Sequence, residues 1–458
     1  MSTALKDMIR NPTVAELELV ARYAALKADP RRERLFEAFA QTGLPHRRIE
    51  DWRWSDFKAA VTALDLPATP PAADPLATDG VATLKFTPQG YTAPASLPPG
   101  LRLLAKDEVQ AMSGAEDAPL GALAAALSGA KNAPATLMAE VTGETPVRLH
   151  MVFSGPGAIN AARVVFLLRP GAQLEVSESH LGGAAFSTAL VEYTLQQGAR
   201  LSRIVYQRGG KTEAQAITAL IHQDADAETK QTVLAFGARV ARIETRLVHQ
   251  ETSSHATLNA AYLAGDGYHI DFTSHVRHGA RACITRQVTK GAVLDGGRGV
   301  FQGKFHVPRN AGQQTDASMQ HNALLLEDGA EVFAKPELEI LADDVQCAHG
   351  NTSGALDQNQ LFYLRQRGIP LEKARALLTE AFIAEALEDA GDHEEALRAE
   401  AQAWLSEVRP APRSRMLSSM RWQTRCAPLM PTCIAASTRW QTRRPKLSKL
   451  PAKTCAHS

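Results

Sequence analysis

The sequence predicts a mainly β protein in which a stacked solenoid lies between two helical regions. Three observations predict this fold. A Gly-Ala phrase recurs ahead of alternating strands, apolar residues follow helical spacing near both ends, and 45% of the residues are hydrophobic. That hydrophobic share is enough for a sizeable core, and a chain of 458 residues allows roughly two to four folding units.

The first part, residues 1–65, is predicted to be a small helical domain. Thr13 and Glu16 match a capping box, and apolar residues at helical spacing follow them. The same part contains the stretch RRIEDWRWSDF, in which Trp52 and Trp54 alternate with charged residues. We interpret the two tryptophans as packing residues and not as a cage for a ligand.

The second part, residues 66–145, is a proline-rich linker and a lead-in to the core, because it opens with LPATPPAADP. The predicted core, residues 146–350, repeats a glycine, usually followed by alanine, just before an alternating stretch. Each glycine is expected to fit either a turn that needs positive φ or a tight backbone corner. A solenoid and a sandwich both fit this pattern, and the returning phrase favours the solenoid. The phrases begin at Gly171, Gly198, Gly237, Gly265, Gly279, Gly291 and Gly329.

The third part, residues 351–408, returns to helical spacing. After a Gly-Ile-Pro break at 368–370, apolar residues from Leu371 to Phe382 share one helical face, and a second stripe runs from Leu397 to Leu405. Two such helices at the end of a solenoid would either cap it or dock a partner. The sequence favours capping.

The last part, residues 409–458, differs from the rest of the chain in its charge. It holds eleven Lys or Arg and no Asp or Glu. Because the whole chain has a net charge of +1, the residues before this part have a net charge of about −10. We predict a basic, disordered tail. It is either a segment that attracts phosphate, as nucleic-acid-binding or membrane-surface tails do, or a non-native, out-of-frame extension.

Motifs for catalysis and export are missing from the sequence. GGRGVFQGKF, residues 296–305, lacks the first glycine and the Ser or Thr of a phosphate loop, and the five cysteines form no CxxC pair. There is no export signal at the start and no run of about 18 apolar residues. The sequence therefore predicts a cytoplasmic protein without an ATP site of its own, and its motifs support no catalytic assignment.

One stretch contains good metal ligands. In ADDVQCAHG, residues 342–350, Cys347 and His349 stand two positions apart after a strand-like run. The alternation of Leu338 and Ile340 predicts that both side chains project from the outer face. Thiolate and imidazole bind zinc or iron well, but two ligands do not complete a tetrahedral site. From spacing alone, half of a metal site and two ordinary residues both stay open.

Three long stretches resemble the SufB/SufD family of the Suf iron-sulfur cluster assembly machinery. They are GRGVFQGKFHV at 297–307, QTDASMQHNALLLEDGAEVFAKPELEILADDVQCAHGNTSGALD at 314–357 and LFYLRQRGIPLEKARALLTEAF at 361–382. The stretch RRIEDWRWSDF at 47–57 is similar to the N-terminal motif of the SufD branch, and the body has too few cysteines for SufB.

The resemblance implies a right-handed parallel β-helix between N-terminal and C-terminal helical domains. It implies a non-catalytic scaffold that forms a heterodimer with SufB through the β-helix and binds the SufC ATPase through the C-terminal helical domain, around Leu361–Ile369. An iron-sulfur cluster would be held transiently at the interface with SufB. The resemblance implies that His349 is a ligand of this cluster and that Cys347, at the neighbouring cysteine position, is a second candidate ligand. It implies binding to neither nucleic acid nor a membrane.

Two other functions remain open alongside this one. The first is a β-helix enzyme that acts on polysaccharide, although such proteins are mostly secreted. The second is a homodimeric metal-binding scaffold without SufB. Co-purification distinguishes them, because a SufD-type chain should bring SufB and SufC with it.

Overall fold

A computed structural model describes residues 9–26, 29–64, 70–105, 114–128, 136–309 and 311–407. The chain divides into two compact units, Met1–Arg409 and Pro410–Ser458. The second unit, and with it the predicted basic tail, lies outside the described residues.

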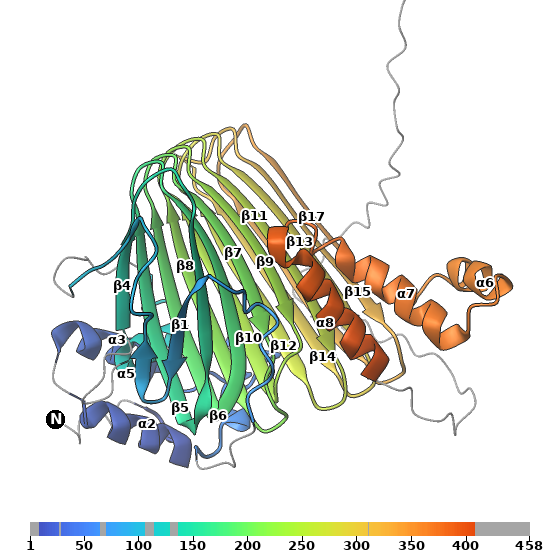
Figure 1. Ribbon diagram of the computed structural model, residues 1–458, viewed down its shortest axis with the longest axis horizontal. Coiled ribbons are helices and arrows are strands. Elements are labelled where there is room, and N and C mark those ends of the chain that lie inside the picture. The colour runs from blue at the N-terminus through green and yellow to red at the C-terminus, as the bar shows by residue number, and fades with distance from the viewer. Residues whose placement is uncertain are drawn as a thin grey trace, which may run out of the picture. The chain divides into compact units, whose positions relative to one another are not determined.

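The described residues form a long β structure with helices before and after it (Figure 1). The strands are β1 Ala82–Thr87, β2 Gly90–Thr92, β3 Leu101–Leu103, β4 Thr136–Val141, β5 Val147–Leu168, β6 Gln173–Leu195, β7 Arg200–Gln207, β8 Ala214–Gln223, β9 Glu228–Ala235, β10 Val240–His249, β11 His255–Ala264, β12 His269–His278, β13 Ile284–Val293, β14 Arg298–Val307, β15 Asp316–Leu325, β16 Glu331–Ile340 and β17 Gln346–Gly354. The helices are α2 Val14–Ala24, α3 Pro30–Thr42, η1 Glu50–Trp52, α4 Phe57–Ala60, α5 Pro119–Leu127, α6 Gln358–Gln366, α7 Leu371–Ala384, η2 Gly391–His393 and α8 Glu394–Glu407.

From β6 onward each strand pairs in parallel with the strand two places further along the chain. Two parallel sheets result. The even sheet contains β4, the second halves of β5 and β6, and β8, β10, β12, β14 and β16. The odd sheet contains β1, the first halves of β5 and β6, and β7, β9, β11, β13, β15 and β17. The chain alternates between the sheets, which confirms the predicted parallel β-helix.

Successive coils place their inward residues in columns. One column in the odd sheet holds apolar or small residues that face the core between the sheets, with partners 27 to 32 residues apart. Its members are Val147, Leu174, Leu201, Thr229, Ala256, Thr285, Ala317 and Cys347. Each coil therefore covers the apolar surface of the coil before it, as in a repeat protein.

The Gly-Ala phrase predicts several corners correctly. Positive φ is found at Gly171, Gly198, Gly237 and Gly329. Gly265 and Gly279 do not have positive φ, but they lie at corners between strands, as the prediction also allows. The prediction is wrong at Gly291, which lies inside β13. Gly291 is needed for space, because a Cβ atom there would lie 2.0 Å from Cζ of the buried Tyr262.

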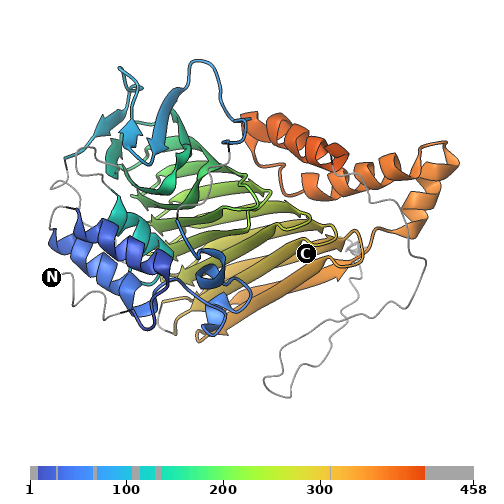
Figure 2. The ribbon, with the colours of Figure 1, turned by 90° about the horizontal axis from the view of Figure 1, so that it is seen from below.

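The N-terminal helices cover the outer face of the even sheet, as Figure 2 shows. The predicted capping box of α2 is present: Thr13 N donates to Glu16 Oε2 at 2.7 Å, and Glu16 N donates to Thr13 Oγ1 at 3.2 Å. Helix α5 lies between this helical layer and the strands, where Leu120 and Leu123 join a buried cluster with Phe186 of β6.

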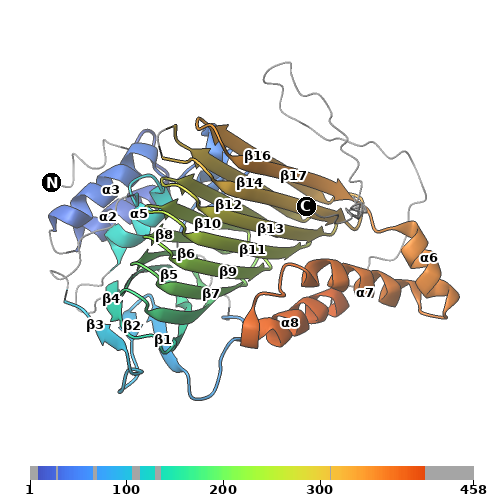
Figure 3. The same cartoon turned by 90° about the horizontal axis from the view of Figure 1, so that it is seen from above.

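The C-terminal helices pack on the outer face of the odd sheet and not over its end (Figure 3). Leu397 and Trp404 of α8 join Leu234 and Leu263 of the strands in one apolar cluster. The Tyr206 hydroxyl also donates to Glu400 at 2.6 Å. The prediction that these helices cap the solenoid is therefore wrong, because their apolar stripes match the flank of the sheet.

A charged pair lies inside the β-helix. Glu178 of β6 and Arg203 of β7 are fully buried, with Arg203 Nε at 2.6 Å from Glu178 Oε1, and the Tyr193 hydroxyl donates to the same oxygen at 2.7 Å. Burial by itself would raise the pKa of Glu178. The Arg203 charge and the hydrogen bonds from His180 and Arg203 outweigh burial and lower this pKa from 4.5 to about 2.

We predict that Glu178→Gln lowers the free energy of unfolding by about 3–5 kcal/mol, because it leaves the Arg203 charge buried without its partner. Since the pKa of Glu178 is lowered by folding, its stabilising effect is complete above about pH 4.5 and is lost as the pH falls towards 2. Urea denaturation between pH 3 and pH 7 measures both effects.

A control is Glu228→Gln on β9, which removes a half-exposed carboxylate 3.8 Å from Arg200. Its cost should stay below about 1 kcal/mol, as for other surface pairs. Equal costs for the two variants would contradict a special role of the buried pair.

Candidate functional site

The β-helix ends in two strands whose outer edges are unpaired. β16 pairs with β14, and β17 pairs with β15. No other strand in the described part of the chain pairs with the far edge of either one. Backbone N–H and C=O groups on such edges are available to a strand from another chain. Ile340 and Leu341 are also exposed at the corner between the two strands.

Cys347 and His349 lie on β17 at this open end. Their register partners on β15 are Ala317 and Met319, which are both buried in the core. Because neighbouring residues of a parallel pair point the same way, Cys347 and His349 are on the core-facing side of the last coil. Cys347 packs against the core and is partly buried, whereas His349 is exposed because no further coil of the described chain covers it.

The prediction that these two side chains project from the outer face is therefore wrong. Leu338 does pack against the core, as its even position in β16 predicts. The turn at 341–345 then changes the phase, with Asp344 at a φ of 59°, so that odd positions face inward in β17. The prediction continues the inward–outward alternation of β16 through the turn into β17. A turn interrupts the two-residue period of a strand, so the alternation starts again with a different phase.

The Cys347 thiol is not activated by its surroundings. Burial has the largest effect and raises its pKa, a hydrogen bond from the Ala317 backbone lowers the pKa by less than burial raises it, and the charge of Asp316 raises it further. The thiol thus keeps its proton at neutral pH until a metal ion or another cation favours the thiolate.

A buried histidine lies one coil below the two residues. His321 Nδ1 is 2.7 Å from Asn351 Oδ1, and His321 Nε2 is 2.9 Å from the Tyr262 hydroxyl. Both contacts are satisfied when Nδ1 carries the proton and Tyr262 donates to Nε2. Burial lowers the pKa of His321 to about 4, so this ring is neutral. The His321 ring also stacks on the Phe301 ring, with 4.7 Å between the two ring centroids. His321 is thereby held in place and supports β17 through its hydrogen bond to Asn351.

Sequence reasoning missed this support. The signal that could have found it is the spacing of 30 residues between His321 and Asn351, which matches the repeat of the column that ends at Cys347.

The open end does not contain a complete metal site. Within the described ranges no three His, Cys, Asp or Glu side chains come together to hold a metal ion. Cys347 and His349 therefore provide at most two donors, from side chains on the same side of β17 whose backbone positions are about 6.6 Å apart along the strand. That donor set suits iron or zinc, and the other ligands would have to come from another molecule.

A second exposed surface lies on the C-terminal helices. In α6, Leu361 is buried, while Phe362 and Tyr363 are 64% and 57% exposed. The Arg367 guanidinium lies 3.6 Å from the centre of the Tyr363 ring. Leu377 of α7 is also exposed. Large exposed apolar side chains that lie close together in sequence commonly mark a protein-binding surface.

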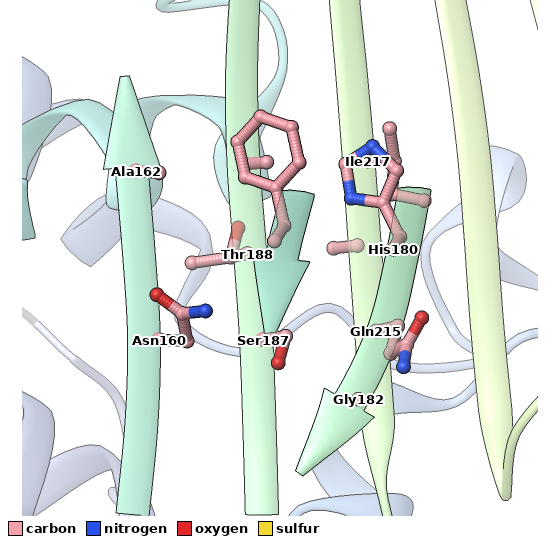
Figure 4. A pocket seen from close by; sticks show the side chains of 11 residues that line it. Asn160, Ala162, His180, Gly182, Ser187, Thr188, Gln215 and Ile217 are labelled. Atoms are coloured by element: carbon pink, nitrogen blue, oxygen red, sulfur yellow. The ribbon is translucent and has the colours of Figure 1, made fainter. Parts of the chain in front are cut away.

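A small cavity inside the β-helix is a weaker candidate. Asn160, Ser187 and Gln215 line it from consecutive coils (Figure 4), and one polar atom of each has no partner among the described protein groups. The centre of a water-sized sphere can move through only about 10 Å³ of it. One water molecule fits this space and can both donate and accept there, whereas a cluster or an organic substrate does not fit.

A comparison with known protein families identifies the family of this chain. The family described as "SUF system FeS cluster assembly, SufBD core domain" matches residues 151–382, which is half of the chain and most of the β-helix. The chain belongs to the SufB/SufD family. The match includes both strands of the open edge, Cys347 and His349, and helix α6 with most of α7.

Curated relatives agree with the family. The chain is 45% identical over 124 residues to the iron-sulfur cluster assembly protein SufD of Escherichia coli, which covers 26% of this chain and 29% of that protein. It is 45% identical over 105 residues to the chloroplastic protein ABCI7 of Arabidopsis thaliana, with 23% and 22% covered. It is 42% identical over 111 residues to the SufBD family protein slr0076 of Synechocystis, with 24% and 23% covered. The aligned stretches thus span less than a third of these relatives.

We predict that Cys347 in the native protein reacts with iodoacetamide with a pH midpoint above that of a free-cysteine peptide, because burial raises the pKa of its thiol. Cys283, which is fully buried, should stay unmodified in the same sample. Peptide mass spectrometry of samples labelled at several pH values measures both. A midpoint below that of the free peptide would show that Cys347 is activated in the free chain.

Proposed function

We propose that this protein is a non-catalytic scaffold subunit of a Suf-type iron-sulfur cluster assembly complex. It pairs with a SufB-type subunit through the open end of the β-helix and docks a SufC-type ATPase through α6 and α7. A nascent cluster is held between the two scaffold subunits as cargo. The observation that carries this proposal is the open end itself, where two unpaired strand edges and two metal-binding side chains occur together.

The strand edges support pairing with another β-helix. β16 and β17 each have one edge without a partner among the described strands, and Ile340 and Leu341 add exposed apolar surface at the corner between them. A second subunit that adds its own edge strand would satisfy the free backbone groups through main-chain hydrogen bonds. A partner of the same fold suits this edge, because its final coil would have the same spacing between strands.

The two side chains support a cluster that is shared. Cys347 and His349 supply one sulfur and one nitrogen on the same side of β17, and no third ligand is near them in the described residues. A SufB-type partner would supply the others. A neutral imidazole binds a cluster less firmly than a thiolate does, which suits cargo that must be passed on.

The C-terminal helices support ATPase docking. Ile383 at the end of α7, together with α8, packs on the odd sheet, whereas Phe362 and Tyr363 of α6 are exposed. Lys290 of β13 also binds Glu385 at 2.7 Å and ties the base of this region to the β-helix. A partner that pulls on α6 would therefore act on the β-helix through α7.

None of the helices described is both long and apolar enough to cross a membrane. The expected cytoplasmic location stays a prediction.

We predict that His349→Ala lowers iron and acid-labile sulfide in the complex by more than half, while the complex still forms, because a ligand is lost but the strand edge is kept. The measurement is anaerobic co-expression with the SufB-type and SufC-type subunits of the same organism, followed by iron and sulfide analysis. Gln346→Ala, which changes an exposed residue of the same strand, is the matched control. An unchanged content of iron and sulfide in His349→Ala would contradict the role of His349 as a cluster ligand. The open end would then serve only as a binding surface for the other subunit.

We also predict that Phe362→Asp weakens binding of the SufC-type subunit at least about tenfold, because a charge replaces an exposed aromatic anchor. Binding to the SufB-type subunit should stay the same, because α6 is not part of the open end. Titration by calorimetry or interferometry measures both affinities, with Gln360→Ala as the control on the same helix. Equal losses in both affinities would point to misfolding and contradict a local role.

A further inference from the structure

The stretch RRIEDWRWSDF has a structural role that the proposed function does not use. Residues 50–55 cross the outer face of the even sheet and contact four successive strands of that face, β10, β12, β14 and β16. The contacts run from well-buried strands to the last strand of the sheet.

The inner contacts anchor the segment on buried strands. The Arg242 guanidinium of β10 lies 3.8 Å from the centre of the Trp52 ring, and Arg242 Nη1 donates to the Asp51 carbonyl at 2.8 Å. Ser55 donates to Asp271 of β12 at 2.5 Å. Trp52, Ser55, Arg242 and Asp271 are all at least 95% buried. These groups satisfy each other's charges and hydrogen bonds, so this part of the segment is firmly held.

The outer contacts reach β16. The Trp54 ring stacks on the Phe333 ring with 5.8 Å between centroids and 19° between planes. Lys335 Nζ lies 2.9 Å from Glu50 Oε1. The hydrogen bond and charge of Lys335 lower the pKa of Glu50, so this carboxylate is ionised at neutral pH.

β16 needs such support because it has little of its own. All ten of its residues are half-buried or exposed, whereas most of β10 is buried. β16 has a strand partner on one side only, among the strands described. Edge strands with few buried contacts are the first to open locally.

We propose that Trp54 and Glu50 are positioning residues for the partner-binding end. They hold β16 against β14, so that its free edge and the adjoining β17 meet another subunit in a single register. The positioning of β16 is a property of the free chain, and only its consequence for partner binding rests on the proposed function.

Hydrogen–deuterium exchange of the full-length chain tests the first part. Trp54→Ala should speed amide exchange in residues 331–340 by roughly 2- to 10-fold, as expected for the loss of one aromatic pair. Exchange in 240–249 should stay unchanged, because β10 keeps its own contacts. Trp54→Phe, which retains a ring, should restore most of the protection. Arg53→Ala, which changes an exposed residue of the same segment, is the matched control.

Affinity for the SufB-type subunit tests the second part. Trp54→Ala should weaken this affinity at an unchanged melting temperature, and Trp54→Phe should recover it. Unchanged exchange at 331–340 would overturn the proposal, and so would faster exchange with unchanged affinity. If the wild-type chain does not bind the SufB-type subunit at all, the proposed function fails, and the exchange result alone decides whether Trp54 holds β16.

Discussion

The in-register stacking of parallel coils is the constraint on which the rest of this structure depends. Each coil aligns its inward residues with those of the coil before it, and the column from Val147 to Cys347 shows the result. The arrangement buries the inner coils, whereas the coil of β16 and β17 has no successor among the described residues. The same rule that builds the core therefore leaves two strand edges free at the described end of the β-helix, with the Cys347 thiol and the His349 imidazole beside them.

Polar groups behave differently inside the β-helix and at its end. Glu178 and Arg203 are buried but neutralise each other, and His321 is kept uncharged by burial and used as a hydrogen-bonding support. At the end, Cys347 is partly buried and keeps its proton, and His349 is exposed. These interior groups thus satisfy one another, whereas the end offers donors that an incoming metal centre could use.

The helical regions lie on the flanks of the β-helix, which keeps its end free. N-terminal helices cover the even sheet, and α7 and α8 cover part of the odd sheet. Two separate surfaces remain available, the strand edges and α6. The proposed scaffold role, with two different partners bound at once, would require such a separation. The segment at 50–55 links one flank to the free edge.

Local patterns in the sequence determined the elements: the capping box at Thr13, the corners at glycines such as Gly171 and Gly198, the helical stripes, and the presence of sulfur and imidazole donors at Cys347 and His349. Only the tertiary structure decided that those donors face inward, because the turn before β17 shifts the alternation by one residue. It also decided that the C-terminal helices lie on a flank, and that Gly291 makes room for Tyr262. A local pattern determines which side of an element is apolar. The register between coils, which pairs residues about 30 positions apart, determines which other residues that apolar side contacts.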